Sequence, residues 1–260
     1  MGRVFVVPRV HDLGVYEETA PPEPLRGVVR CLWRSAETAP KRIVPDACLD
    51  LVVGEQDVFV AGPDTGAWMS ATRPGAVLRG LRFRPGLAPL VLGVAADELR
   101  DRRVPLGELW GRQGERVTDQ VLTGARTLGD VVAARLREPA PDPAVTALIA
   151  RLDAGQSRVG PAVGQLAVGE RQLRRRFVQA VGYGPATYLR VSRFQRAVAL
   201  AARVPGLAAL AATAGYADQA HLSRDCRALT GLTAGAYFSH LSTVDSMVAE
   251  RNGSVMVSGR

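Results

Sequence analysis

The sequence predicts an α+β protein. An N-terminal antiparallel β-rich domain with helices is followed by a C-terminal all-α domain, in which two helix-turn-helix units are joined by a long helix. Three observations predict this fold: short valine-rich runs up to about residue 85, helical periodicity throughout the second half, and a repeat with a period of 49 residues.

The N-terminal half contains apolar runs bounded by Gly, Pro and Asp, a pattern typical of β-strands. The runs lie within residues 3–10, 25–34, 42–53, 56–66 and 76–86. We expect them to form a small antiparallel sheet or half-barrel. Beyond Pro89, apolar residues recur three and four apart within residues 90–101 and 120–138, which predicts helices there.

The segment EPAPDP, residues 138–143, marks the expected domain boundary. Proline lacks a backbone donor and disfavours helix at the residue before it. We therefore expect domains over residues 1–138 and 139–241, followed by a flexible polar tail over 242–260. The helices predicted in the second domain lie within residues 142–155, 161–167, 170–182, 185–204, 206–215, 218–231 and 233–241.

The second half repeats itself, because LRRRFVQAVGYGPATYL (173–189) aligns with LSRDCRALTGLTAGAYF (222–238). In each copy a short apolar helix, a tight turn and a second helix follow one another. The second helix has apolar residues four apart on one face and polar residues on the other, so it needs one buried side only. This is the helix-turn-helix arrangement, whose second helix can enter a DNA major groove.

The ends of these helices are also encoded locally. Asp218 is a good N-cap for the second helix of the second unit, and Gly169 is a weaker one for the first. Pro185 begins the connecting helix and VPG at 204–206 ends it. About 19 residues at 1.5 Å each give a rod of roughly 28 Å, against about 34 Å for one turn of DNA. The two units could therefore occupy successive major grooves.

The net charge of +8 lies entirely in residues 151–240, which hold 12 arginines against four acidic residues. Residues 1–150 carry 19 basic and 19 acidic side chains, and residues 241–260 carry two of each. Such asymmetry indicates a partner that is a nucleic acid or another polyanion. A membrane is the weaker alternative, since no apolar run is long enough to span a bilayer and the arginines are spread over several elements.

The cysteines and the N-terminus argue against several other classes. Cys31, Cys48 and Cys226 are odd in number and lack C-x-x-C spacing, so we expect free thiols in a reducing cytoplasm, without a metal site or cofactor. The first residues hold too few apolar side chains for the hydrophobic region of a signal peptide.

A family resemblance rests on these motifs. The pattern L-x-V-x-E-R-x-L-x-R-x-F, then G-x-x-P-x-x-Y-L-x-x-x-R, then L-x-x-L-A-x-x-x-G-Y-x-D-x-x-H-L-S-R, resembles the AraC/XylS transcription regulators over about residues 145–240. The front half, with IVPDACLDLVV and GLRFRPG, is similar to a subgroup whose small β-rich N-terminal domain is poorly characterised. The chain departs from the family pattern at Gly169, Cys226 and Ala234, where Ser, Phe and Pro are usual. The small Cys226 puts the packing of the second unit, and its share of DNA affinity, in doubt.

The resemblance implies a set of base-facing residues: Arg171, Arg174, Arg175, Gln219, Ala220, His221 and Arg224. An arginine fork can bond guanine O6 and N7 together. For His221, packing at the helix start is an equal alternative. Phosphate contact is an alternative to solvent for Arg176, and to a structural role for Arg190 and Arg193.

The function expected from these features is a cytoplasmic, sequence-specific DNA-binding regulator with double-stranded DNA and RNA polymerase as partners. Activation is the expected effect on transcription, and repression stays open as the alternative. The N-terminal domain would sense a small-molecule effector or pair two subunits, and both roles stay open. The residues considered for an effector pocket fit a sheet core or a solvated face equally well: Trp33, Trp68, Asp46, Asp50, Arg82 and Arg84.

Two other classes of protein are alternatives to a DNA-binding regulator. A DNA-repair alkyltransferase or other enzyme carrying such a module needs a metal-held cysteine cluster or a catalytic constellation, and neither stands out. An RNA-binding or protein-interaction module lacks the aromatic platform that RNA recognition normally uses, as 5% of the chain is aromatic. We therefore expect no catalytic activity.

Overall fold

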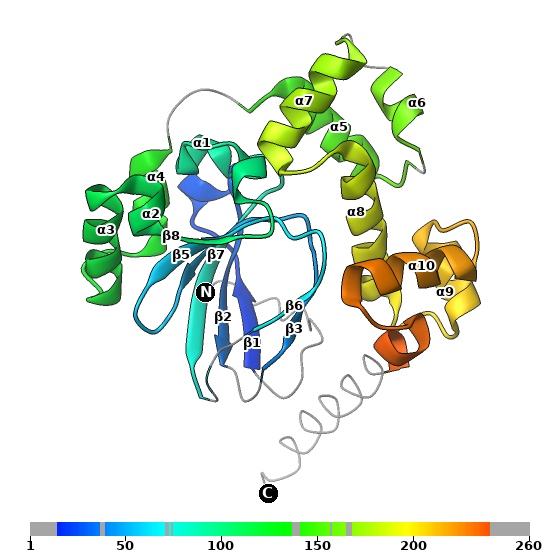
Figure 1. The fold of residues 1–260 in the computed structure, drawn as a ribbon, viewed down its shortest axis with the longest axis horizontal. Helices are drawn as coiled ribbons and strands as arrows, with labels where there is room; N and C mark the ends of the chain where they lie inside the picture. The colour runs from blue at the N-terminus through cyan, green and yellow to red at the C-terminus, as the bar shows by residue number, and fades with distance from the viewer. Residues whose placement is uncertain are drawn as a thin grey trace, which may run out of the picture.

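The computed structural model describes residues 15–36, 40–70, 73, 75–136, 141–156, 158–164 and 168–239. Its N-terminal part is built on a six-stranded sheet, with a helical C-terminal part beside it (Figure 1). The expected boundary near residue 138 and the tail at 242–260 lie outside the described residues, so both stay predictions.

The sheet has the strand order β1-β2-β7-β4-β5-β8, and each neighbouring pair is antiparallel. The strands are β1 (Val15–Thr19), β2 (Val29–Ala36), β4 (Asp50–Val53), β5 (Val58–Ala61), β7 (Val77–Phe83) and β8 (Arg103–Pro105). A second, two-stranded sheet pairs β3 (Arg42–Ile43) with β6 (Trp68–Met69). This confirms the predicted antiparallel β-rich domain. The expected strand at 3–10 lies outside the described residues, and β1, β6 and β8 were not predicted.

Helices cover one face and one end of the main sheet. They are η1 (Glu23–Leu25), α1 (Pro89–Leu92), η2 (Ala96–Leu99), α2 (Leu106–Trp110), α3 (Arg112–Leu122) and α4 (Leu128–Arg135). Val60, Leu81 and Phe83 of the sheet join Val91 and Val132 of these helices in one buried cluster. Burial of such side chains contributes roughly 1.5–3 kcal/mol each before the entropic cost of ordering.

The helix expected over residues 90–101 was wrong as a single element. The chain leaves the helix at Gly93, whose φ of 78° is left-handed, and continues as the separate 3-10 turn η2. The segment at 120–138 is likewise broken near Gly124, where φ is 77°. A new helix then starts at a reciprocal cap between Thr127 and Asp130. Glycine is common at such breaks because positive φ costs it little.

The C-terminal part is all helical in the residues described. It comprises α5 (Pro143–Asp153), α6 (Val159–Gly164), α7 (Glu170–Val181), α8 (Pro185–Leu200), α9 (Leu207–Ala214) and α10 (Gln219–Thr230), with residues 234–239 also helical. Helices α6 and α7 form the first helix-turn-helix unit, and α9 and α10 form the second. The two units are joined by α8, as predicted. Their shared core includes Leu148, Phe177, Tyr188, Phe194 and Leu222.

The repeat is visible in the helix ends. Helices α7 and α10 both end at a left-handed glycine, Gly182 with φ 99° and Gly231 with φ 75°, and these two positions are aligned in the repeat. Asp218 caps α10 by accepting the amide of His221 at 2.6 Å. Gly169 begins α7 without a side-chain cap. Both predicted N-caps are therefore in place.

The connecting helix α8 is shorter than expected. It has 16 residues, which correspond to about 24 Å, because the chain changes to turns at residues 201–203. There the backbone bonds tighten to residues three apart, from the Arg203 amide to the Leu200 carbonyl at 2.9 Å. The rod of 28 Å predicted from the sequence is corrected accordingly.

The two parts pack against one another at several points. A Cβ atom on Gly182 would lie 2.3 Å from Pro63 of the N-terminal part, so the close approach requires glycine. Gln195 of α8 donates to the Pro45 carbonyl at 2.6 Å, and Ala47 is buried in the C-terminal core.

Candidate nucleic-acid interface

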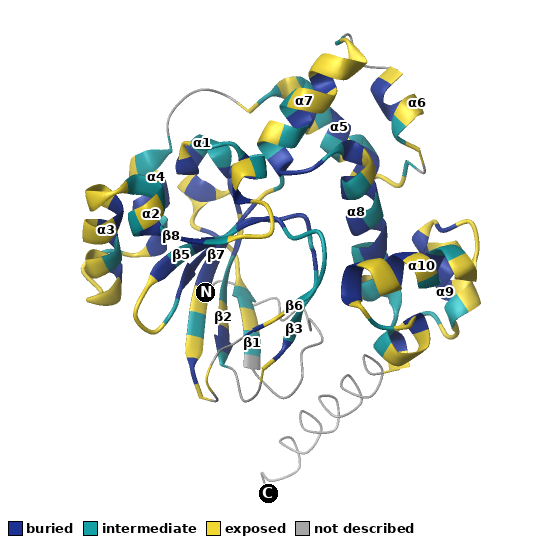
Figure 2. Ribbon diagram, viewed as in Figure 1, coloured by how far each residue is buried: buried dark blue, intermediate teal, exposed yellow. Residues whose placement is uncertain are grey.

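Helix α7 has one buried and one exposed face (Figure 2). Leu173 and Phe177 are fully buried in the C-terminal core. Arg171, Arg174 and Arg175 are exposed on the opposite side, three and four positions apart, so they share one face. None of the three makes a hydrogen bond or ion pair with another described residue. A cationic surface with free guanidinium groups is therefore available on this helix.

Helix α10, the counterpart of α7 in the repeat, has the same arrangement with fewer charges. Leu222 and Cys226 are fully buried, while Gln219, Ala220 and Arg224 are exposed. The position of Arg224 in the repeat is that of Arg175 in α7, and both are exposed. The structure thus leaves the sequence-predicted residues of both helices exposed, with the exception of His221.

The small side chain of Cys226 is packed in the second unit, whereas its effect on DNA affinity stays a prediction. Its side chain is fully buried, and its sulfur lies 3.7 Å from the Leu232 carbonyl oxygen and 3.7 Å from the Thr230 hydroxyl oxygen. Thr230 in turn donates to the Cys226 carbonyl at 2.7 Å. The thiol is therefore in contact with the turn that follows α10.

His221 is turned towards its own domain. Its ring meets Tyr216 edge to face at 5.0 Å, and its Nε2 lies 3.3 Å from Arg193 and 3.8 Å from Asp225. Burial raises the pKa of Asp225, and the nearby His221 opposes that shift. These contacts favour the packing alternative for His221 over base contact.

Arg176 differs from the two arginines that precede it. It forms a bidentate ion pair with Asp142 of α5, with the Nη2 to Oδ1 distance at 2.6 Å. Asp142 also caps α5 by accepting the amides of Ala144 and Val145. The hydrogen bond from Arg176 holds the pKa of Asp142 below its usual range. The guanidinium is therefore engaged in joining α7 to α5, which favours a structural role.

The arginines of α8 were also considered for phosphate contacts. Arg193 is 7% exposed and lies over the Tyr216 ring at 5.3 Å, so its burial argues against that role. Arg190 is partly buried, and its Nε has no hydrogen-bond partner among the described residues. Arg196 binds the Ala214 and Asp153 carbonyls, as expected for a structural arginine.

A cavity of about 140 Å³ lies between the sheet and α8. Five of the six residues considered for an effector pocket line it, namely Trp33, Asp46, Asp50, Trp68 and Arg82. The sixth, Arg84, instead donates to the Arg26 carbonyl. Sequence reasoning missed the contributions of Lys41, the only lysine of the chain, and of Gln195, Val198 and Tyr237 from the helical part.

Arg82 is the electrostatic centre of this cavity. It is 8% exposed and bonds both carboxylate oxygens of Asp50 at 2.8 and 2.9 Å, with Asp46 at 3.3 Å and Glu18 at 3.4 Å. Burial opposes the charge, but the carboxylates outweigh it and hold the pKa of Arg82 well above its ordinary value. A second pair, Arg103 with Asp64 at 2.7 Å, lies across the cavity.

Two family models match separate parts of the chain. One, described as a helix-turn-helix domain, matches residues 163–240, from the last two residues of α6 to beyond α10. The other, described as a domain of unknown function (DUF6597), matches residues 17–105. No curated protein matches the chain.

Among solved structures, the fold is similar to crystal structures of ToxT from Vibrio cholerae. The O395 structure is 8% identical, covers 81% of this chain and 96% of its own, and has a TM-score of 0.44. A structure of ToxT with a bound unsaturated fatty acid, from strain SCE256, is 9% identical, covers 94% and 99% of the two chains, and has a TM-score of 0.43.

In the described residues, no helix is long and apolar enough to cross a membrane. The chain therefore carries an AraC-type helix-turn-helix domain at its C-terminal end and a domain of unknown function in its N-terminal part, and the helix-turn-helix domain supports a DNA-binding transcription regulator.

Proposed function

We propose that this regulator reads a specific DNA sequence by placing α7 and α10 in successive major grooves. The observation that supports this most directly is the equivalent exposure of Arg175 and Arg224 at aligned positions of the two units, each opposite a fully buried face. A helix of this kind can enter the groove without losing its packing.

In the proposed complex, Arg171, Arg174 and Arg175 contact base edges and phosphates from α7, and Gln219, Ala220 and Arg224 do so from α10. Because α7 presents three free cations and α10 presents fewer, we expect the first unit to supply most of the electrostatic attraction to phosphate. The second unit would add sequence preference through Gln219, since an amide can bond adenine N6 and N7 together.

Selection from random duplexes, followed by hydroxyl-radical footprinting, tests the proposal. We expect an enriched motif with two half-sites about one helical turn apart, and protection on one side of the duplex. Enrichment of no motif, or a footprint shorter than one turn, would overturn the two-groove proposal. The triple variant with Arg171, Arg174 and Arg175 changed to Ala should lose the half-site contacted by α7.

A charge control separates base contact from general attraction. Arg203 is exposed but lies after α8, outside both recognition helices. Arg203→Ala removes one cation, as a single substitution of Arg171, Arg174 or Arg175 would, so we expect a small loss of affinity that is equal for all sequences.

Other parts of the proposal concern the N-terminal domain and the cellular context. We infer that the N-terminal domain binds a small-molecule effector, because its cavity is lined by residues from both parts of the chain. We further propose that the protein forms a homodimer and acts in the cytoplasm. There it would contact RNA polymerase and activate transcription. Size-exclusion chromatography with light scattering tests the dimer, and a promoter-reporter assay tests activation.

A further inference from the structure

We propose that the cavity between the sheet and α8 binds a small, flat, uncharged aromatic molecule that offers a hydrogen-bond acceptor to Trp68. This deepens the effector role and rests on it. The cavity is not a surface of one domain: its walls include Trp33, Phe59 and Trp68 on the N-terminal side, and Val198 and Tyr237 on the C-terminal side.

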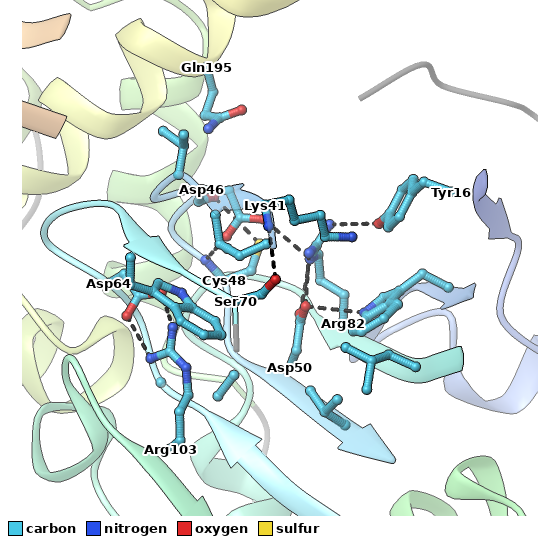
Figure 3. Close-up of a pocket in the computed structure, with 18 of the residues that line it drawn as sticks. Tyr16, Lys41, Asp46, Cys48, Asp50, Asp64, Ser70, Arg82, Arg103 and Gln195 are labelled. Atoms are coloured by element: carbon cyan, nitrogen blue, oxygen red, sulfur yellow. Dashed lines mark hydrogen bonds and ion pairs between the residues drawn. The ribbon is translucent and has the colours of Figure 1, made fainter. Parts of the chain in front are cut away.

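The formal charges of the lining residues disfavour a ligand with a net charge. Lys41, Arg82 and Arg103 stand against Asp46, Asp50 and Asp64, so the lining sums to zero (Figure 3). Arg82 and Arg103 already bond these carboxylates. A ligand with a net charge would enter a partly buried site without a counter-ion, or would displace one of these partners. Either course costs several kcal/mol.

The remaining lining groups do not change this sum. Burial raises the pKa of the Cys48 thiol to about 12, so Cys48 is neutral near pH 7. The Lys41 ammonium contacts the Ser35 hydroxyl at 2.5 Å and lies 6.0 Å from the centre of the Tyr16 ring. The formal charges of the residues that line the cavity therefore balance one another.

Two lining residues each have a buried donor without a hydrogen-bond partner among the described residues, namely Trp68 at Nε1 and Arg103 at Nε. The Nε1 of Trp68 is buried and has no hydrogen-bond acceptor among the described residues. A buried donor without a partner costs roughly 1–3 kcal/mol, so a ligand oxygen or nitrogen that accepts this hydrogen relieves the cost. The Trp68 ring is held in place by Arg103, whose guanidinium stacks on it at 4.0 Å.

The size and the walls set the rest of the ligand. A cavity of this volume accommodates roughly a single aromatic ring. Its walls are rich in aromatic rings and in branched aliphatic side chains such as Ile43 and Val44. Stacking and edge contacts with such walls favour a planar ring.

The position of the cavity connects it to DNA binding. Val198 belongs to α8, the helix that joins the two units, and Gln195 one turn earlier holds the Pro45 carbonyl. Arg42, between the lining residues Lys41 and Ile43, donates to the Thr230 carbonyl at the end of α10 at 2.8 Å. An occupant therefore contacts elements that hold the second recognition helix.

Tryptophan fluorescence can be used to detect binding in the cavity. It has three tryptophans, of which Trp33 and Trp68 line the cavity, while Trp110 stacks with Arg135 elsewhere. In the Trp110→Phe variant, tryptophan fluorescence therefore comes from the cavity alone. Three probes of similar size and different charge are titrated: benzamide, benzoate and benzylamine, which is a cation at neutral pH.

We expect a saturable fluorescence change with benzamide, and binding at least about tenfold weaker for the two charged probes. Trp68→Phe in the same background keeps a ring but removes the donor, and should weaken benzamide about three- to tenfold. Thermal unfolding of the wild-type protein with each probe gives a second readout that needs no variant. Benzoate or benzylamine binding as tightly as benzamide, or no saturable benzamide binding, would overturn the proposal.

DNA affinity measured without any probe keeps this result separate from the proposed function. Trp68 is not among the residues proposed to contact DNA, so Trp68→Phe should leave the motif selected by the protein unchanged. Loss of benzamide binding with intact DNA recognition therefore concerns the cavity alone. Benzamide binding by a protein that selects no DNA motif would reject the proposed function and leave the ligand class standing.

Discussion

Arg175 and Arg176 are adjacent in the chain and carry the same charge, yet the structure gives them different surroundings. Arg175 is exposed without a partner in the described residues, whereas Arg176 bonds Asp142 with two hydrogen bonds. Replacing each in turn by alanine removes one cation from the same helix. We expect the two variants to fail in different assays.

For Arg175→Ala the loss should appear in DNA recognition. A base contact by an arginine fork contributes roughly 1–3 kcal/mol of discrimination, which corresponds to about five- to 150-fold in relative affinity. The folded chain loses no contact with a described residue. Its free energy of unfolding should therefore change by no more than about 0.5 kcal/mol, as for ordinary surface substitutions.

For Arg176→Ala the loss should appear in folding. The variant removes the ion pair that joins α7 to α5 and leaves the carboxylate of Asp142 with its capping bonds only. We expect a lower unfolding temperature than for Arg175→Ala. Discrimination between specific and scrambled DNA should change no more than in Arg203→Ala, because both remove one charge without a base contact.

Fluorescence anisotropy with the selected duplex and a scrambled duplex, at three salt concentrations, measures the first effect. Differential scanning fluorimetry measures the second. Equal loss of discrimination in Arg175→Ala and Arg176→Ala would refute the assignment of faces on α7. A larger drop in unfolding temperature for Arg175→Ala would refute the structural role of Arg176.

Three further outcomes follow from local geometry. Gly182→Ala places a methyl group 2.3 Å from the side chain of Pro63 at a residue whose φ is 99°, so the free energy of unfolding should fall by about 1–3 kcal/mol. Gly184→Ala is the control, because no atom lies within 4 Å of the added methyl group, and it should change the stability little. Scanning fluorimetry compares the two variants. Because Cys48 is buried and its pKa is raised to about 12, a thiol-specific reagent should modify it only after denaturation, and rapid modification of native protein would contradict this. The pKa of Asp142 is lowered by its bond from Arg176, so the stabilisation is present above the unfolded-state value of about 3.9 and is lost as pH falls through the folded-state value. Unfolding temperatures of Asp142→Asn and wild type should therefore converge in acid, and a gap that persists there would count against the ion pair.

The recognition helices could be predicted from the sequence because their signals are local. The four-residue spacing of Leu173 and Phe177 fixes the buried face of α7, and Asp218 and Gly231 mark the two ends of α10. These signals need no knowledge of distant residues. The same is true of the repeat, which aligns the two helices position by position.

Features that depend on distant residues could not be predicted in this way. The role of Arg176 differs from that of the neighbouring arginines because it bonds Asp142. This partner lies 34 positions away in the chain, so the sequence around Arg176 does not show it. The strand β8 is three residues long and exists because β5 pairs with it. A run of three residues has too few positions to show a period, so no sequence signal distinguishes it from a turn.

The cavity lies between these two cases. Alternation along a strand identifies residues that share a face, but not whether that face is packed or lines a space. Trp33 and Arg82 were therefore identified as candidates without an assignment. Gln195 and Tyr237 gave no signal, since they meet the sheet only through the packing of the two parts.

The contacts between the two parts place the N-terminal domain at the C-terminal ends of both recognition helices. Arg42 donates to the Thr230 carbonyl at the end of α10, and Arg100 donates at 3.4 Å to the carbonyl of Gly182, the residue that ends α7. Cations are favourable at these ends because the last carbonyls of a helix have no partner within it. The arginines proposed for DNA contact lie on the exposed faces of the same helices, and Arg171 and Gln219 lie in their first turns. The N-terminal domain therefore contacts the ends of α7 and α10 without covering the residues proposed to face DNA. Ile43 of β3 lines the cavity, and Arg42 of the same strand bonds the end of α10, so a molecule bound in the cavity would lie beside the strand that makes this contact.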